Sequence, residues 1–214
     1  RGETDEFVEP TLIADAPAVQ DGDSAFAFNF RADRTRQLCR MLTGLHAEDW
    51  QFKRDQPEIH LATMTRYEET YPFPVAFPPK DPENTFGELL ADAGDTQLRT
   101  AESEKAPHVT YFFSGGREDP FPGEQRRIVA SPDVPTYDLQ PEMSASEVTD
   151  AAIAALAADE SPDALVLNYA NPDMVGHTGD FDAAVEAVEA VDAELGRLAS
   201  ALEAAGSHVL VTAD

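Results

Sequence analysis

Short runs of β-branched and aromatic residues alternate along this chain with amphipathic segments that begin at capping residues and end at glycines. This order is typical of an α/β sheet with helices packed on it. The run SAFAFNF, Ser24–Phe30, predicts the first strand. It leads through Arg31 into a predicted helix that extends to about Leu42, where Gly44 ends it.

A proline-rich stretch separates this strand and helix from the rest of the chain. Tyr71–Pro82 contains five prolines, which cannot pair within a central strand because proline has no backbone N–H. We therefore expect a linker or hinge near residues 76–82. Directly after it, Thr85 and Glu88 form a capping box for the helix FGELLADA, and Gly94 ends that helix.

The next segment predicts a strand, a turn and a long loop. HVTYFF, His108–Phe113, alternates as a strand does, and SGGRED after it is typical of a turn. Residues 116–143 carry five prolines and few periodic apolar positions. We expect this part to be a long surface excursion.

The last third of the chain returns to the helix and strand pattern. Ser144 and Glu147 form a capping box for VTDAAIAALAA, and DALVLNYA predicts a buried strand. A long helix is expected over about Phe181–Ala205, followed by a final strand, HVLVTAD. Steps of three or four place the apolar side chains of the long helix on one face: Phe181, Val185, Val188, Val191, Leu195, Leu198 and Leu202.

The strongly negative net charge argues against a protein that binds nucleic acid or anionic membranes. The chain has 214 residues, 42% of them hydrophobic, and can bury a core, but its formal net charge is -26. Acidic residues are spread along the whole chain, as in salt-adapted proteins, and their field repels nucleic acid and anionic membranes. No run reaches the roughly 18 apolar residues of a membrane span, and the single Cys39 cannot form an internal disulfide. We expect a soluble, cytoplasmic, monomeric protein from a halophile.

Three acidic and imidazole groups are candidates for a metal site. Asp173 and His177 lie four residues apart in the loop NYANPDMVGHTG, directly after one predicted strand, and Asp214 directly follows another. Because the carboxyl ends of parallel strands meet at one edge of a sheet, we expect the three side chains at that edge. Carboxylate oxygen with imidazole nitrogen suits a divalent ion such as Mn²⁺ or Zn²⁺. Taken singly, each residue is better interpreted as a turn former, a helix cap or a solvated loop residue, and it is the three together that favour a metal site.

Basic residues on so acidic a chain suggest an anion site. Arg31 and Arg34 lie three apart at the start of a predicted helix, where backbone N–H groups are free to bind anions. The arginine fork matches phosphate or carboxylate oxygens in pairs. A surface ion pair with Asp33 is an equally good interpretation. Lys105, expected just before a strand, could add a point charge.

Five stretches together resemble one known family. These are FNFRADRTRQL, AESEKAPHVTYFFSGGRE, YDLQPEMSASEVTD, NYANPDMVGHTG and the terminal VTAD. They are similar to the 2,3-bisphosphoglycerate-independent phosphoglycerate mutases, which are isomerases of the alkaline-phosphatase-like superfamily. The resemblance covers nearly the whole chain and implies two α/β domains, a doubly wound metal-binding phosphatase domain and an inserted phosphotransferase domain.

The resemblance also implies roles for parts of this chain. Residues 1–78 correspond to the end of the phosphotransferase domain and 79–214 to part of the phosphatase domain. Asp173 and His177 would ligate one divalent ion and Asp214 a second, with Mn²⁺ expected and Zn²⁺ or Mg²⁺ as alternatives. The glycolytic substrate phosphoglycerate, a small molecule, would bind Arg31, Arg34 and Lys105. The list of implied site residues is thus Arg31, Arg34, Lys105, Asp173, His177 and Asp214.

The chain also looks incomplete. It begins without methionine and stops at Asp214, directly after a strand that should be central, so we expect an internal piece of a longer protein. In the family the nucleophilic serine, which carries a phosphoserine intermediate, lies in an N-terminal part outside this chain. A piece without that serine is not expected to be active alone.

Two other functions remain open on sequence alone. Another metal-dependent phosphatase or a phosphopentomutase of the same superfamily would share the Asp and His ligands. The motifs FRADR and EKAPHVTYFF favour the glycerate mutases, because they belong to the substrate side of that family. A non-catalytic protein whose acidic surface binds cations diffusely is the alternative from a different class.

Overall fold

The computed structural model describes residues 8–9, 11, 13, 17–46, 56–80 and 82–213. They form two compact units, one of Pro10–Asp81 and one consisting mainly of Pro82–Asp214. The two units meet in sequence at the end of the proline-rich segment. Assignment of 1–78 and 79–214 to phosphotransferase and phosphatase domains remains a prediction. No helix in the described ranges has the length and apolar character needed to span a membrane.

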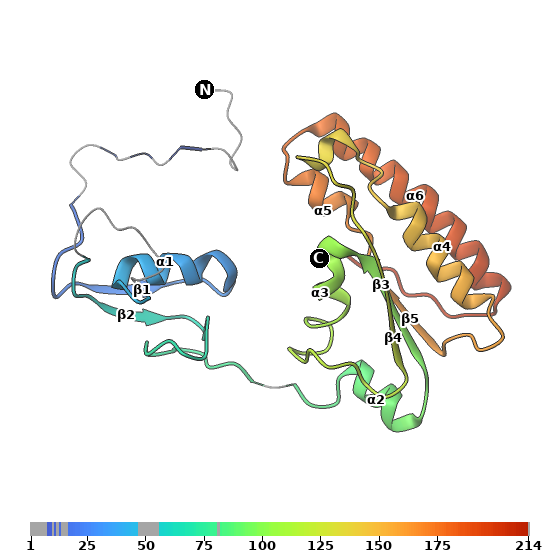
Figure 1. Ribbon diagram of the computed structural model, residues 1–214, viewed down its shortest axis with the longest axis horizontal. Helices are drawn as coiled ribbons and strands as arrows, with labels where there is room; N and C mark the ends of the chain where they lie inside the picture. Colours follow the sequence, from blue (N-terminus) through green and yellow to red (C-terminus); the bar gives the residue numbers. More distant parts are fainter. Residues whose placement is uncertain are drawn as a thin grey trace. The chain divides into compact units, whose positions relative to one another are not determined.

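The smaller unit is a two-stranded parallel sheet covered by one helix. β1, Ser24–Ala27, pairs with β2, His60–Thr63, and α1, Asp33–Thr43, packs over them (Figure 1). The buried Cys39 of α1 lies in a core cluster with Leu61 and Tyr67. β1 is shorter than the predicted strand, but the predicted helix and its end at Gly44, whose φ is 69°, are confirmed.

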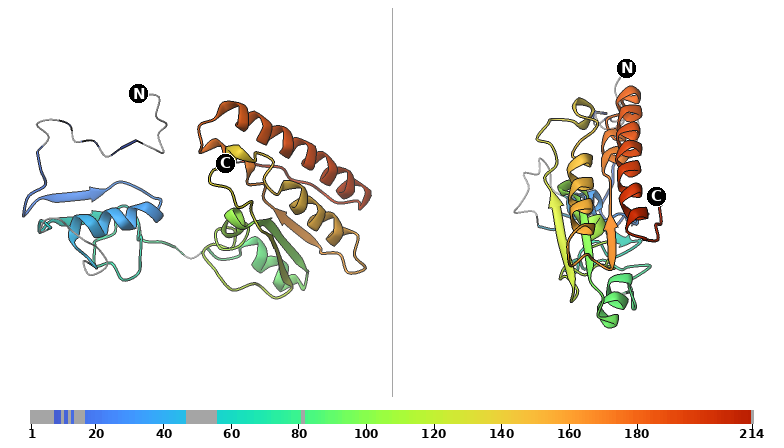
Figure 2. Two further views of the ribbon diagram at one scale, coloured as in Figure 1. Left: turned by 45° about the horizontal axis from the view of Figure 1, so that its top comes forward. Right: turned by 90° about the vertical axis from the view of Figure 1, so that its right-hand side faces the viewer.

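The larger unit is a three-stranded parallel sheet with helices on both faces, which confirms the α/β class. Figure 1 shows α4 and α6 side by side on one face and α2 and α3 on the other, and the right-hand view in Figure 2 shows the strands next to one another. β3 is central and entirely buried, between β4 and β5. The strands are β4, Glu124–Val129; β3, Gln97–Glu102; and β5, Ala164–Leu167. The helices are α2, Phe86–Ala93; α3, Ala106–Val109; α4, Ala145–Leu156; α5, Asn171–Gly176; and α6, Phe181–Ala204, with 3₁₀ turns η3, Ser103–Lys105, and η4, Tyr137–Leu139.

Helix ends follow the capping signals in most cases. The Glu88 carboxylate accepts the backbone N–H of Thr85 at 3.3 Å, and Gly94 ends α2 with a φ of 81°. α6 has nearly its predicted length, and the Asp180 carboxylate caps it by accepting the N–H of Ala183 at 2.9 Å. The predicted capping box at Ser144 is wrong, because that hydroxyl donates to the Ala130 carbonyl oxygen at 2.9 Å.

The predicted apolar face of α6 is only partly buried. Leu198 and Leu202 are in the core, but Phe181 is 79% exposed. Val185 and Val188 are exposed as well. The half of the helix near α5 instead buries the small side chains Ala183 and Ala187. The prediction was therefore right for the C-terminal half of the helix and wrong for the N-terminal half.

The strand predicted at His108–Phe113 is wrong. The strand lies earlier, as β3, and the chain then turns through η3 into α3. Pro107 occupies the first turn of α3, where its missing N–H costs nothing. Lys105 therefore follows a strand instead of preceding one, which places it at the carboxyl edge of the sheet.

Two further predictions about strands are wrong. Residues 116–143 are not only a surface excursion, because β4 lies within them and pairs in parallel with β3 along its whole length. The segment His208–Ala213 forms no strand and is exposed, with Leu210 at 98%. A strand exists only if a neighbour supplies its hydrogen bonds, and none of the described strands pairs with this segment.

Glu102, the last residue of β3, is a buried carboxylate at 1% exposure. Burial raises its pKa, and the hydrogen bond from the Ser144 N–H offsets this only in part. As pH rises above the ordinary pKa of a glutamate, Glu102 loses its proton in the unfolded chain before it does so in the folded protein. The folded state therefore loses stability until its own carboxyl group ionises.

We therefore expect Glu102→Gln to stabilise the full-length protein near pH 8 by about 1 kcal/mol or more, with a smaller difference near pH 5. Urea unfolding at both values in molar KCl measures this. Glu118→Gln, the same change at an exposed position, is the control and should leave the pH dependence unchanged. If the difference in stability between Glu102→Gln and the wild type is the same at pH 8 and at pH 5, the burial argument is wrong.

Candidate metal and anion sites

Asp173 and His177 lie on one face of α5. β5 ends at Leu167, and α5 begins four residues later with Asp173 in its first turn and His177 at its C-cap. The i,i+4 spacing brings His177 Nε2 to 3.4 Å from Asp173 Oδ1. Both side chains are about half exposed, at 52% for Asp173 and 55% for His177. An ion from solvent can reach both atoms.

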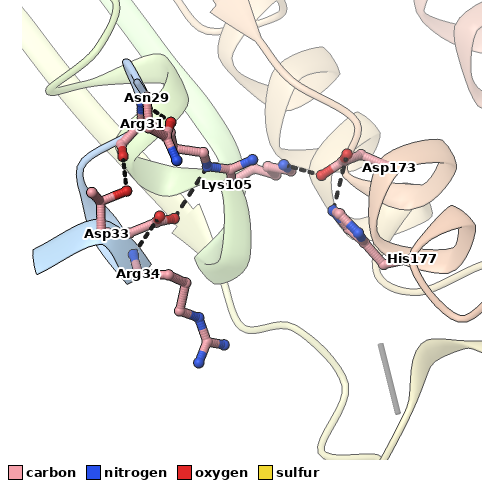
Figure 3. Close-up of polar contacts among 8 residues, drawn as sticks. Asn29, Arg31, Asp33, Arg34, Lys105, Asp173 and His177 are labelled. Carbon is pink, nitrogen blue, oxygen red and sulfur yellow. Dashed lines mark hydrogen bonds and ion pairs between the residues drawn. The ribbon is translucent and has the colours of Figure 1, made fainter. Parts of the chain in front are cut away.

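The other carboxylate oxygen of Asp173 is paired with the ammonium group of Lys105, as Figure 3 shows. Lys105 ends η3, directly after β3, and its side chain is only 11% exposed. Partial burial acts to raise the pKa of Asp173. The hydrogen bond and charge of Lys105, with the charges of His177 and His108, outweigh burial and hold that pKa below its usual value. Asp173 is therefore an anion at neutral pH, the form that binds metal.

This donor set suits a divalent ion. An oxygen and a nitrogen 3.4 Å apart can both contact one ion at the usual ligand distances of about 2.0–2.2 Å. The site is not complete in the part of the chain that the structure describes, where no three His, Cys, Asp or Glu side chains converge as a metal site. The third predicted ligand, Asp214, lies outside the described residues.

Arg31 and Arg34 lie in the smaller unit, at the start of α1. Arg31 Nε donates to the Asp33 carboxylate at 3.1 Å, so the ion pair considered from the sequence is present. The backbone N–H of Arg34 donates to the same carboxylate at 2.6 Å, which is the largest reason that the pKa of Asp33 is lowered. Both arginines are exposed, and the Arg31–Asp33 pair is a weak contact that an anionic ligand could replace.

His108 was missed by the sequence reasoning. It lies in α3, which begins directly after Lys105, and its charge helps to lower the pKa of Asp173. The wrong strand prediction for residues 108–113 concealed it, because that prediction placed Lys105 before the strand and not in one helical turn with His108. Helical spacing of three from Lys105 would have indicated a shared face.

A sequence profile of the Metalloenzyme superfamily matches residues 23–214. The chain belongs to the metalloenzyme superfamily. It is 60% identical over 214 residues to the 2,3-bisphosphoglycerate-independent phosphoglycerate mutase of Haloquadratum walsbyi, covering 100% of this chain and 42% of that protein. The mutase of Pseudomonas fluorescens is 52% identical with the same coverage. The chain thus spans about two fifths of the length of these relatives, and one of them comes from a halophilic archaeon.

A solved phosphoglycerate mutase has a similar fold. The phosphoglycerate mutase of Leishmania mexicana, crystallised at low cobalt concentration, matches with a TM-score of 0.63 and 32% identity. The match covers 88% of this chain and 35% of the other. The α/β class and the similarity to cofactor-independent phosphoglycerate mutases are thereby confirmed.

Proposed function

We propose that this chain is part of a cofactor-independent phosphoglycerate mutase, which interconverts 3-phosphoglycerate and 2-phosphoglycerate. The observation that carries the proposal is the convergence of Lys105, Asp173 and His177 at the carboxyl edge of the sheet, from segments that follow two neighbouring strands. Relatives from archaea and bacteria that bear the mutase name match the whole chain. Their names favour the mutase over another superfamily phosphatase or phosphopentomutase.

In this proposal Asp173 and His177 hold one divalent ion, with Asp173 Oδ1 and His177 Nε2 as the donor atoms. Asp214 is a ligand of a second ion, completed by residues outside this chain. Mn²⁺ is the expected metal and Zn²⁺ an alternative, because the donors combine oxygen and nitrogen. Mg²⁺ is the other alternative. Bound divalent ions supply Lewis-acid chemistry, which activates a serine hydroxyl and neutralises charge on the phosphoryl oxygens.

The remaining residues bind the substrate and keep the site ordered. The guanidinium groups of Arg31 and Arg34 can each donate two hydrogen bonds to the carboxylate or phosphate of phosphoglycerate, and Lys105 adds a positive charge. Lys105 also keeps the Asp173 carboxylate in place and ionised. The nucleophilic serine that forms the phosphoserine intermediate is proposed to lie outside this chain, so the chain alone should be inactive.

The test is an assay of the full-length protein without added 2,3-bisphosphoglycerate, in molar KCl. Conversion of 3- to 2-phosphoglycerate, followed by coupling to enolase, is expected in the presence of Mn²⁺ and should disappear after chelation. The metal should restore it, and the isolated chain of 214 residues should show none. Mutase activity that persists after complete removal of metal would refute the mechanism, and phosphatase activity without mutase activity would support the rival enzymes.

A further inference from the structure

Asn171, the first residue of α5, is fully buried and joins this helix to a loop far away in sequence. Its side-chain NH₂ group donates to the carbonyl oxygens of Pro141 at 2.9 Å and Glu142 at 2.7 Å. Figure 1 shows the segment between β4 and α4, which contains both carbonyls, passing beside α5. A single buried side chain therefore ties α5 to this segment at two points.

The same loop is tied to β3 on its other side. The backbone N–H of Ser144 donates to the Glu102 carboxylate at 2.9 Å, and Glu102 is the last residue of β3. Lys105 follows three residues later. We call Glu102, the segment Pro141–Ser144 and Asn171 together the polar bracket. The bracket connects the strand end that leads to Lys105 with the helix that carries Asp173.

α5 needs such an external support. It has only six residues, and its N-cap Ala170 makes no side-chain hydrogen bond. Helices this short are unstable without tertiary contacts. Because Asp173 is two residues after Asn171, any shift at the start of the helix moves the carboxylate directly.

The segment Pro141–Ser144 of the polar bracket has a strained backbone. Met143 has a φ of 46°, a left-handed backbone conformation that is unfavourable for residues with a Cβ atom. Its side chain, at 4% exposure, packs with Ala170 and Val175 on either side of the α5 start. Strain of this kind persists only where the surroundings over-determine the conformation, and it is concentrated near functional sites. The loop is therefore built to keep one position against α5.

We propose that Asn171 is a positioning residue for the metal site: through the polar bracket it places Asp173 and His177 relative to Lys105. This inference rests on the proposed role of Asp173 and His177 as metal ligands. Asn171 touches neither the ion nor the substrate, and its loss acts through the geometry of α5. Loss of hydrogen bonds that orient metal ligands commonly lowers metal affinity by about 10–100-fold.

The experiment compares four variants of the full-length protein by Mn²⁺ titration, with free Mn²⁺ measured by electron paramagnetic resonance. Asn171→Leu removes both donors at similar volume, and Asn171→Asp sets a carboxylate against the two carbonyl oxygens. Gln97→Met is the control, since it also removes a buried amide, at the opposite end of β3. That amide donates to the Gly87 carbonyl oxygen and accepts a hydrogen bond from Arg99. Asp173→Asn tests the metal site itself.

We expect both Asn171 variants to bind Mn²⁺ about 10–100-fold more weakly while far-UV circular dichroism stays unchanged, and Gln97→Met to bind as the wild type does. If Asp173→Asn loses one bound Mn²⁺ ion and folded Asn171 variants retain wild-type affinity for that ion, the positioning role is wrong. If Asp173→Asn also retains wild-type affinity, the proposed metal site is wrong. Equal weakening by Gln97→Met would show a general loss of stability and overturn the proposal.

A measurement on the wild-type protein covers the case in which the Asn171 variants do not fold. If the bracket and the ligands are coupled, binding at Asp173 must stabilise the bracket in return. Saturating Mn²⁺ should then slow amide hydrogen exchange several-fold in the segment that contains the Ser144 amide. Mass spectrometry measures this exchange. Unchanged exchange there in fully loaded protein would contradict the proposal.

Discussion

Replacing Asp173 by asparagine in the full-length protein is expected to lower kcat/KM for 3-phosphoglycerate by about 10³-fold or more, because a lost metal ion removes several kcal/mol of charge stabilisation. The amide keeps the shape of the side chain but not its charge. It therefore cannot replace the anionic oxygen that faces His177 Nε2. Mn²⁺ affinity, measured on the same samples, should fall together with activity.

Lys105→Met separates this role from that of an ordinary ion pair. If Asp173 served only to neutralise the buried ammonium of Lys105, removing either partner would have the same effect. In the metal-site interpretation, Lys105→Met frees one carboxylate oxygen of Asp173, so Mn²⁺ affinity is retained or rises while activity falls. The two variants should therefore differ in metal binding and agree only in their loss of activity.

Asp182→Asn is the matched control for the charge change. Asp182 lies in the first turn of α6, is exposed, and makes no ion pair with any residue that the structure describes. Its replacement should leave kcat/KM within about twofold, as surface substitutions away from a site usually do. Equal metal affinity in Asp173→Asn and Asp182→Asn would remove Asp173 from the metal site.

Local signals in the sequence predicted most helices and one strand of the larger unit. Thr85, Glu88 and Gly94 determine α2 through backbone hydrogen bonds within a few residues, and the apolar run before Asn168 gives β5. Such features depend on neighbours in sequence and need no knowledge of the fold. The contact between Asp173 and His177 is also local, because it follows from i,i+4 spacing on one turn of helix, but the sequence analysis placed both residues in a loop and missed α5.

The missed strands β3 and β4 depend on contacts between distant segments. β3 is fully buried although it contains Gln97, Arg99 and Glu102, and its arginine lies over the Phe113 ring at 4.5 Å and donates to the Gln97 side chain. In β4, Arg126 pairs with Glu124 at 2.6 Å. Both of these hydrogen bonds join residues two apart on one strand, but the polar side chains of β3 are buried only once β3 pairs with its neighbours. Without that pairing the polar sequences of the two strands look like loop. The position of Lys105 at the sheet edge could not be derived correctly without β3.

Raising KCl from about 0.1 M to molar concentrations is expected to increase the apparent melting temperature of the full-length protein by about 10 °C or more. The physical reason is self-repulsion of a chain whose formal net charge is -26. The Debye length falls from about 10 Å at 0.1 M salt to about 3 Å at 1 M, so that repulsion between surface carboxylates is largely screened. Circular dichroism melting at a series of KCl concentrations measures the shift.

α6 offers a direct test of this cause. Asp182, Glu186 and Glu189 are exposed, follow one another at spacings of four and three, and make no ion pair within the described part of the chain. Like charges at these spacings destabilise a helix by about 0.2–0.5 kcal/mol per pair. The triple variant Asp182→Asn, Glu186→Gln, Glu189→Gln should therefore melt higher than the wild type at low salt and depend less on KCl.

Glu194 provides the matched control on the same helix. Its carboxylate accepts a hydrogen bond from Arg197 at 2.6 Å, so Glu194→Gln removes an attraction together with a negative charge. That variant should not gain stability at low salt, although its net charge also becomes less negative. If Glu194→Gln and the triple variant raise the melting temperature at low salt equally per charge removed, net charge alone explains the effect and the local charge pattern on α6 does not.

If the wild type melts at the same temperature in low and molar KCl, the acidic surface is not a salt adaptation, because there would be no repulsion for the salt to screen.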